Sequence, residues 1–274
     1  QFFFLAAHIP SGKLGTINSI PPILFGSLRM GVLFICLIPF CKLIIPEKKY
    51  IFPLIGFCIS FGVFVNMFLY LSIDTTSILA PITIGAQLSI PIGIILSSFF
   101  LKEKIHKKKY FLILAAITGV VVLAFDPKVT EEYLASIFIC AMAFFYAASQ
   151  VFSRYLKNLD IKFTNALMSL VGFIILFSIS FTFEGNSFDH LTVIKWNGWI
   201  MIIYSGAVIS IFGHMVMFYL YKFYPVDKIL PFYSLFPIFS VLLSFIIFGE
   251  IPTLLMIIGG IIVITSVFFL NKMR

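Results

Sequence analysis

Five polar side chains stand inside stretches of sequence that otherwise suit a lipid environment: His8, Asn66, Gln87, Gln150 and His214. The hydroxyl of a Ser or Thr in such a stretch can donate a hydrogen bond to a carbonyl of its own helix. The hydrogen-bonding groups of an amide or an imidazole are not all satisfied within the same helix. Polar groups at the centre of a bilayer are costly unless they face protein or water. These residues therefore offer hydrogen bonding, either to a polar molecule in a cavity or to a neighbouring helix, and both alternatives stay open.

Three aromatic residues extend this candidate set: Tyr70, Tyr146 and Tyr233. A tyrosine ring can stack on another ring or on a cation, while its hydroxyl binds a polar group. Together with the amides and imidazoles, these tyrosines form the predicted lining of a cavity for a small-molecule ligand.

Catalytic and metal-binding patterns are missing from the sequence. It contains no Gly-x-Ser-x-Gly, no His-Glu-x-x-His and no phosphate-binding glycine loop, and its four histidines are scattered singly. Its four cysteines lie in or at the ends of apolar runs without the paired spacing of a metal site or a disulfide framework. We expect neither an enzyme nor a bound metal or cofactor.

Two prolines flank one of the amides in the segment PITIGAQLSIP, which covers residues 81–91. A proline has no backbone N–H and leaves the carbonyl four residues earlier without its helical donor. At membrane depth such a carbonyl needs protein or water nearby. Pro81 and Pro91 thus predict a bent helix beside a hydrated cavity, with Gln87 pointing into it.

The composition indicates the class of protein in which these residues lie. The chain is 61% hydrophobic and 11% charged, with a mean hydropathy of +1.12, whereas soluble domains are about 45–50% apolar and about 25% charged. The net charge of +8 is distributed as short basic blocks between apolar runs, which is typical of membrane orientation and not of nucleic-acid binding. We expect an all-α integral membrane protein whose surroundings are the lipid bilayer.

About 20 apolar residues are needed to cross the hydrocarbon core as a helix. Ten runs meet this requirement, and short connections make neighbours antiparallel. They cover residues 1–18, 22–42, 51–72, 76–101, 109–126, 133–155, 163–183, 196–221, 228–248 and 252–271.

The basic residues orient these ten predicted spans. Fifteen Lys and Arg fall on the side that holds the termini, and three, Lys13, Lys128 and Lys195, fall on the other. The positive-inside rule then places both termini in the cytoplasm. Arg29 lies about eight residues inside its predicted helix, where it either pairs with carbonyls or meets an anionic group.

The two halves of the chain resemble each other with opposite orientation. Residues 89–105 can be laid on 236–252, with Glu103 over Glu250. In a separate pairing of NMFLYL with HMVMFYL, Asn66 falls opposite His214. Five helices per half reverse the direction of the second half, as in transporters built from inverted repeats. We expect one repeat over residues 1–126 and another over 130–274.

Several motifs resemble the EamA type of the drug/metabolite transporter superfamily. They are SIPPILFGSLRMGVLF (19–34), AMAFFYAASQVFSRYLKNLD (141–160) and FGEIPTLLMIIGGIIVI (248–264). The resemblance covers the whole chain and implies ten helices in two inverted five-helix repeats that transport small metabolites or drugs. One departure bears on the substrate: the Trp-Gly typical of the first helix is Leu5-Ala6 here, and its polar neighbour is His8.

The combined interpretation is a metabolite transporter of a bacterial cytoplasmic membrane that works by alternating access. The resemblance favours amino acids or their derivatives as substrates. Uptake of a nucleoside-like metabolite such as S-adenosylmethionine, and a non-transporting membrane scaffold subunit, remain alternatives. Assembly of the chain into a homodimer is a further alternative that the sequence leaves open.

Overall fold

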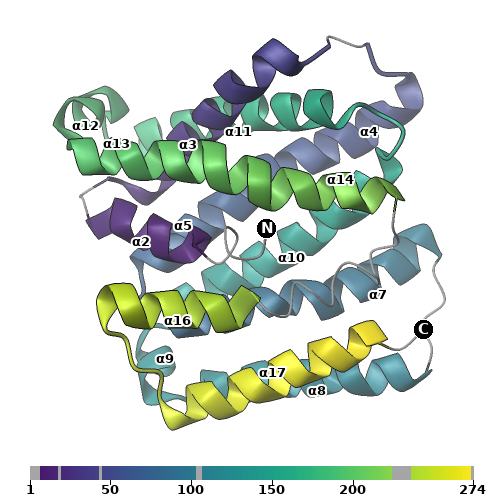
Figure 1. Ribbon diagram of the computed structural model, residues 1–274, viewed down its shortest axis with the longest axis vertical. Helices are drawn as coiled ribbons and strands as arrows, with labels where there is room; N and C mark the ends of the chain where they lie inside the picture. Colours follow the sequence, from purple (N-terminus) through teal and green to yellow (C-terminus); the bar gives the residue numbers. More distant parts are fainter. Residues whose placement is uncertain (1–6, 18–19, 43–44, 103–106, 224–235, 273–274) are drawn as a thin grey trace.

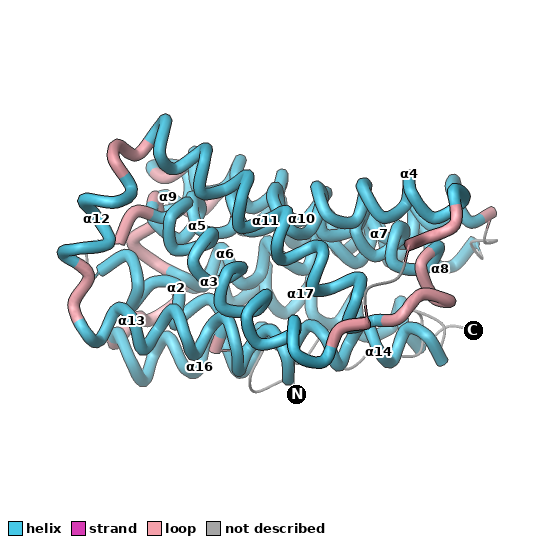
Figure 2. Tube along the Cα trace, turned by 90° about the horizontal axis from the view of Figure 1, so that it is seen from above, coloured by secondary structure: helices cyan, strands magenta, loops and turns pink. Residues whose placement is uncertain are grey.

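The computed structural model describes residues 7–17, 20–42, 45–102, 107–223 and 236–272. Within these ranges the chain is helical throughout, and no β-strand occurs. Figure 1 shows the helices running side by side across the molecule, and Figure 2 shows that they form two layers. The expected all-α architecture is therefore confirmed for the described part of the chain.

The first half is made of long helices that change winding along their length. Its elements are α2 (His8–Ile17), α3 (Pro22–Leu37), η1 (Ile38–Phe40), α4 (Lys48–Phe57), η2 (Cys58–Val65), α5 (Asn66–Asp74), α6 (Leu79–Gly85), η3 (Ala86–Leu88), α7 (Ser89–Leu101) and α8 (Lys107–Ala124).

The second half follows a similar succession. Its elements are α9 (Pro127–Glu131), α10 (Tyr133–Tyr155), α11 (Ile161–Phe183), α12 (Ser187–Val193), α13 (Trp196–Ile203), η4 (Tyr204–Met215), α14 (Val216–Phe223), α16 (Phe236–Phe248) and α17 (Leu254–Lys272).

Six helical stretches of the described chain are long and apolar enough to cross a membrane. They are Pro22–Phe40, Lys48–Asp74, Leu79–Leu101, Tyr133–Tyr155, Ile161–Phe183 and Trp196–Met215. Shorter apolar helices cover Lys109–Ala124, Phe236–Phe248 and Leu254–Leu270. These bounds agree with the hydropathy runs to within a few residues, while the predicted spans at 1–18 and 228–248 lie partly outside the described residues.

Two of the long helices pass through π-helical stretches, η2 and η4. A π-turn shifts the hydrogen-bonding register by one residue and is frequent at functional sites. Polar side chains bind backbone carbonyls at both stretches: the Asn66 amide donates to the Phe61 oxygen at 2.7 Å, and the Ser210 hydroxyl donates to the Ser205 oxygen at 3.1 Å. Both π-helical stretches thus bring polar groups to buried positions.

Glycines bring some helices into close contact. A Cβ at Gly172 of α11 would lie 2.6 Å from the backbone oxygen of Gly62 in η2, and one at Gly259 of α17 would lie 2.7 Å from that of Gly119 in α8. Small residues at such crossings let helix backbones approach in membranes, where van der Waals packing drives association. In Figure 1, α17 and α8 run beside each other along one edge of the molecule.

The helical winding changes at Gln87, where the sequence predicts a bent helix. The helix that begins at Leu79 tightens into a 3₁₀ turn at Ala86–Leu88 before it continues as α7. Pro91 has no backbone N–H for the carbonyl four residues earlier, which is the physical cause of a local break.

Carboxylates bind the N-termini of two helices. Glu184 accepts hydrogen bonds from the backbone N–H groups of Ile23 (2.7 Å) and Leu24 (2.9 Å) at the start of α3, and Glu250 accepts one from Leu79 (2.8 Å) at the start of α6. A negative charge at a helix N-terminus is stabilising. Glu103, the sequence counterpart of Glu250 in the first half, lies outside the described residues.

Candidate functional site

A cavity of about 30 Å³ lies where helices from both halves of the chain meet. It is lined by residues of α2, α3, η2, α5, η3, α10, η4 and α16: His8, Ile9, Arg29, Phe61, Val65, Asn66, Leu69, Ala86, Met142, Tyr146, His214 and Phe236. A space of this volume holds about two water molecules. In this conformation a metabolite fits only if the surrounding helices move apart.

Arg29 is the one Lys or Arg among the described residues of the cavity wall, and it is 1% exposed. Its guanidinium donates to the Asn66 side-chain oxygen, to the Ser205 backbone oxygen (3.2 Å) and to the Ser210 hydroxyl (3.0 Å). All three acceptors are neutral. The only ion pair within the described residues is Lys49–Glu47, on the surface, so no described carboxylate balances the Arg29 charge.

Asn66 connects this arginine to the π-helical stretch η2. Its amide oxygen accepts from Arg29, and its amide nitrogen donates to the backbone oxygens of Phe61 (2.7 Å) and Gly62 (3.3 Å). An amide has both donor and acceptor atoms, so one side chain can serve the backbone and the guanidinium together. The position of Arg29 in the cavity wall thus depends on the local winding of η2.

Two imidazoles face each other beside the guanidinium. The rings of His8 and His214 have centroids 5.4 Å apart in an edge-to-face arrangement, and His8 Nε2 lies 3.0 Å from the Tyr70 hydroxyl. The Tyr70 hydroxyl also lies 3.4 Å from the hydroxyl of Ser205. Both ring nitrogens of His214 are buried without a hydrogen-bond partner among the described residues.

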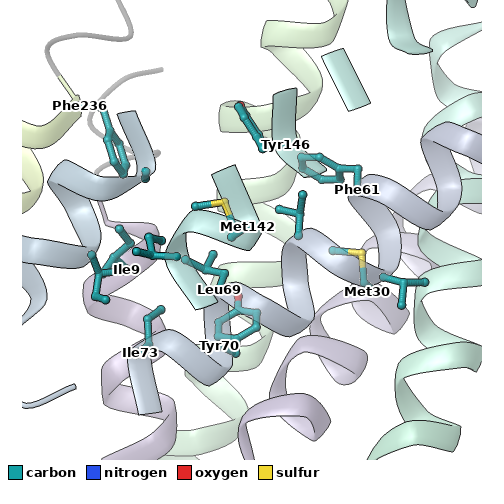
Figure 3. Packing of buried hydrophobic residues seen from close by; sticks show 14 of the residues in the cluster. Ile9, Met30, Phe61, Leu69, Tyr70, Ile73, Met142, Tyr146 and Phe236 are labelled. Atoms are coloured by element: carbon teal, nitrogen blue, oxygen red, sulfur yellow. The ribbon is translucent and has the colours of Figure 1, made fainter. Parts of the chain in front are cut away.

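The rest of the wall is apolar and partly aromatic. Figure 3 shows Phe61, Leu69, Met142 and Tyr146 lying near one another in the buried cluster. The Phe61 ring lies 5.2 Å from the His214 ring, centroid to centroid. The cavity therefore combines one cationic group and hydrogen-bonding rings with a surface suited to an apolar body.

The structure places the predicted site residues in three groups. His8, Asn66, Tyr146 and His214 line the cavity, and Tyr70 lies behind it, bonded to His8. Gln87 and Gln150 are buried but are not among the described lining residues, and Tyr233 lies outside the residues that the structure describes. Their predicted roles in substrate binding stay predictions.

Gln87 and Gln150 are unusual because their amides lack partners within the described part of the chain. Both amide atoms of Gln87 and the amide nitrogen of Gln150 are buried without a hydrogen-bond partner among the described residues. Gln150 lies against Gly93 on α7, where a Cβ would come within 3.2 Å of its amide oxygen. These amides lie at helix contacts next to the site.

Sequence reasoning did not assign some residues that the structure brings to the site. For Arg29, the sequence leaves two alternatives for the partner of the guanidinium, backbone carbonyls or an anionic group. The structure shows the guanidinium bound to one carbonyl and two side chains. Apolar wall residues such as Phe61, Met142 and Phe236 could not be identified from the sequence as cavity-lining, because apolar residues occur throughout it.

Metal chemistry has no support in the described part of the chain. No group of three or more His, Cys, Asp or Glu residues there is arranged to hold a metal ion. The site instead offers hydrogen-bond donors, a fixed positive charge and aromatic surface within a bundle of membrane-length helices.

These features define a class of protein: a helical membrane protein with a polar site enclosed between its helices. Residues 133–272, just over half of the chain, match the model of the EamA-like transporter family. The chain belongs to this family, and the family together with the apolar helices indicates a membrane transporter.

Comparison with solved structures supports the fold along the whole chain. A structure titled "Crystal structure of protein" is 16% identical in sequence, with a TM-score of 0.66, and the match covers 99% of this chain and 98% of that one. At this identity the likeness shows the fold alone. Among curated proteins, none matches this sequence.

Proposed function

We propose that the protein moves small metabolites, amino acids or their derivatives, across a bacterial cytoplasmic membrane by alternating access. The observation that carries this proposal is the cavity in which Arg29, Asn66 and His214 meet, because it is bounded by helices from both halves of the chain. Transporters commonly bind substrate between two repeats and expose the site to either side by moving one repeat against the other.

The proposed architecture is ten membrane-spanning helices in two inverted five-helix repeats, 1–126 and 130–274, with both termini in the cytoplasm. The second helices of the two repeats, α3 and α11, support it. The start of α3 is bound by Glu184 at the end of α11, while Lys162 at the start of α11 lies 5.8 Å from the Phe40 ring at the end of the α3 segment. Equivalent helices of an inverted repeat run antiparallel in this way.

The third helices of the proposed repeats give a second line of support. Each changes from α to π winding in its middle, at Cys58–Val65 and at Tyr204–Met215. Asn66 follows the first π-helical stretch and His214 lies near the end of the second, and both line the cavity. Irregular winding of a membrane helix beside a polar cavity fits a transport site.

Reconstitution into liposomes tests this function. Flux of labelled amino acids and related metabolites would be measured with and without a proton gradient, and protein-free liposomes give the background. We expect saturable flux of at least one compound that falls when His214 is replaced by Phe, because the larger side chain fills the cavity. A matched control is Phe212→Leu on the same helix, since the Phe212 side chain is exposed on the outer surface. Absence of flux for every compound would favour the scaffold alternative.

A further inference from the structure

We propose that the cavity recognises the carboxylate of a monoanionic or zwitterionic metabolite, with Arg29 as the cationic partner and His214 as an additional hydrogen-bond donor. The proposal deepens the proposed function, since it names the substrate class of the same site. It rests on two independent observations within the described residues: Arg29 has no carboxylate partner, and the ring nitrogens of His214 have no hydrogen-bond partner.

The first observation concerns charge. The Arg29 side chain is 1% exposed, and its three hydrogen-bond acceptors are an amide oxygen, a hydroxyl and a backbone carbonyl. The Tyr70 phenol is a further neutral neighbour. An isolated buried charge is strongly unfavourable unless it is paired. With no described carboxylate in reach, a bound anion would supply the missing countercharge.

The second observation concerns hydrogen bonding. His214 is 7% exposed, lines the cavity and has no hydrogen-bond partner for either ring nitrogen among the described residues. Buried polar atoms in folded proteins are nearly always bonded. A neutral imidazole carries one N–H donor, and an acceptor in the cavity would satisfy it. Arg29 and His214 thus converge on the same space from α3 and η4.

Charge balance favours a carboxylate over a phosphate. Among the described residues that line the cavity, Arg29 is the only Lys or Arg, so these residues supply one fixed cation. A carboxylate carries one negative charge, and arginine binds its planar oxygen pair well. A phosphate ester carries about −1.5 to −2 at neutral pH, which would leave excess negative charge in a buried site. Phe61, Met142 and Phe236 suit an apolar substrate body next to the carboxylate.

Binding can be tested without transport. Thermal unfolding of the purified full-length protein in detergent would be followed in titrations with phenylacetate, phenylacetamide and phenyl phosphate, and with L-phenylalanine and L-methionine and their amides. We expect at least one acid to stabilise the protein, with an apparent affinity at least about tenfold higher than that of its amide and of phenyl phosphate, because losing one member of a buried charge pair costs at least this factor. Equal responses to acid and amide, stronger binding of phenyl phosphate, or no response to any acid would overturn the proposal.

Variants assign the effect to Arg29. Arg29→Gln removes the charge and should abolish the preference for acid over amide, whereas Arg29→Lys should keep part of it. Lys13→Gln is the matched control, since Lys13 binds the backbone oxygens of Ile73 and Thr76 outside the cavity lining and should leave the preference unchanged. Retained preference in Arg29→Gln would overturn the assignment. If that variant does not fold, His214→Leu must weaken acid binding, and an unchanged affinity would overturn the proposal.

The outcome separates this inference from the proposed function. Flux without any preference for carboxylates would leave a transporter whose site does not use Arg29 in this way. Selective carboxylate binding without flux would leave the anion site in place in a protein that does not transport.

Discussion

The Arg29 guanidinium donates a hydrogen bond to the side-chain oxygen of Asn66, and the Asn66 amide nitrogen donates in turn to the Phe61 backbone oxygen at 2.7 Å. This connection joins α3 to the π-helical stretch η2, so a change in the winding of η2 would move the cationic group. In an alternating-access cycle, the same connection would couple the position of the charge in the cavity to the movement of the helices.

Replacement of Asn66 by Ala should destabilise the protein. The change leaves the Arg29 guanidinium without one acceptor and removes the donor to the Phe61 oxygen, and each lost partner of a buried polar group costs about 1–3 kcal/mol. The control is Asn165→Ala, because Asn165 is also buried but makes a single described bond, to the Ile161 oxygen at 2.9 Å. Thermal unfolding in detergent should show the larger loss for Asn66→Ala, and equal losses would contradict the bridging role.

Gly172→Ala should disturb the contact between α11 and η2. The new Cβ would lie 2.6 Å from the backbone oxygen of Gly62, and a backbone atom cannot be displaced without moving the helix. Overpacking of this kind costs about 1–3 kcal/mol. Gly31→Ala is the control, since its Cβ would meet only ring atoms of Phe173, the nearest at 3.0 Å, and a side chain can shift. A lower unfolding temperature for Gly31→Ala than for Gly172→Ala would refute this explanation.

The pH dependence of stability should report on Glu184. This residue directly follows Phe183, the last residue of α11. Burial, supported by the nearby Asp74 charge, raises the pKa of the Glu184 carboxyl above its ordinary 4.5, and the N–H groups of Ile23 and Leu24 offset only part of the effect. The folded state therefore binds this proton more tightly than the unfolded state.

The sign of the change follows from this pKa. Protonated Glu184 contributes fully to the free energy of unfolding below pH 4.5. This contribution is lost as the pH rises through the higher pKa of the folded state. The stability of the wild type relative to Glu184→Gln should thus decrease between about pH 4 and about pH 7. Thermal unfolding of both proteins across this range measures the difference, and an increase would show that the pKa is lowered instead.

Labelling of single cysteines tests the proposed orientation. Cys41 follows the end of the α3 segment, whereas the exposed Thr192 lies in α12, after the opposite end of the antiparallel α11. In a variant whose four native cysteines are replaced by Ser, a membrane-impermeant maleimide should label Thr192→Cys in intact cells. In a second variant that keeps Cys41 and has the other three replaced, it should label Cys41 only after the membrane is permeabilised. The reverse pattern would place the termini outside the cytoplasm.

The expected helices and the observed ones agree because a span depends on local composition. The run 133–155 coincides with Tyr133–Tyr155, and 163–183 differs from Ile161–Phe183 by two residues at one end. Lipid solvates apolar side chains on all sides, so the length of an apolar run is enough to indicate a membrane-spanning helix. The motifs of the EamA type likewise lie in continuous segments and could be recognised without coordinates.

The tertiary structure alone decided how the polar residues combine. His8 and His214 are far apart in the chain, yet their ring centroids lie 5.4 Å apart in an edge-to-face arrangement. Gln87, another polar residue of the predicted site, is not among the described residues that line the cavity. The π-helical stretches rotate the residues that follow them relative to regular α periodicity, so a face drawn at 3.6 residues per turn does not give the contacts of Asn66. Residue type and hydropathy therefore identified which side chains need partners. The helix register and packing determined which partners they have, and left the Arg29 charge without a carboxylate partner among the described residues.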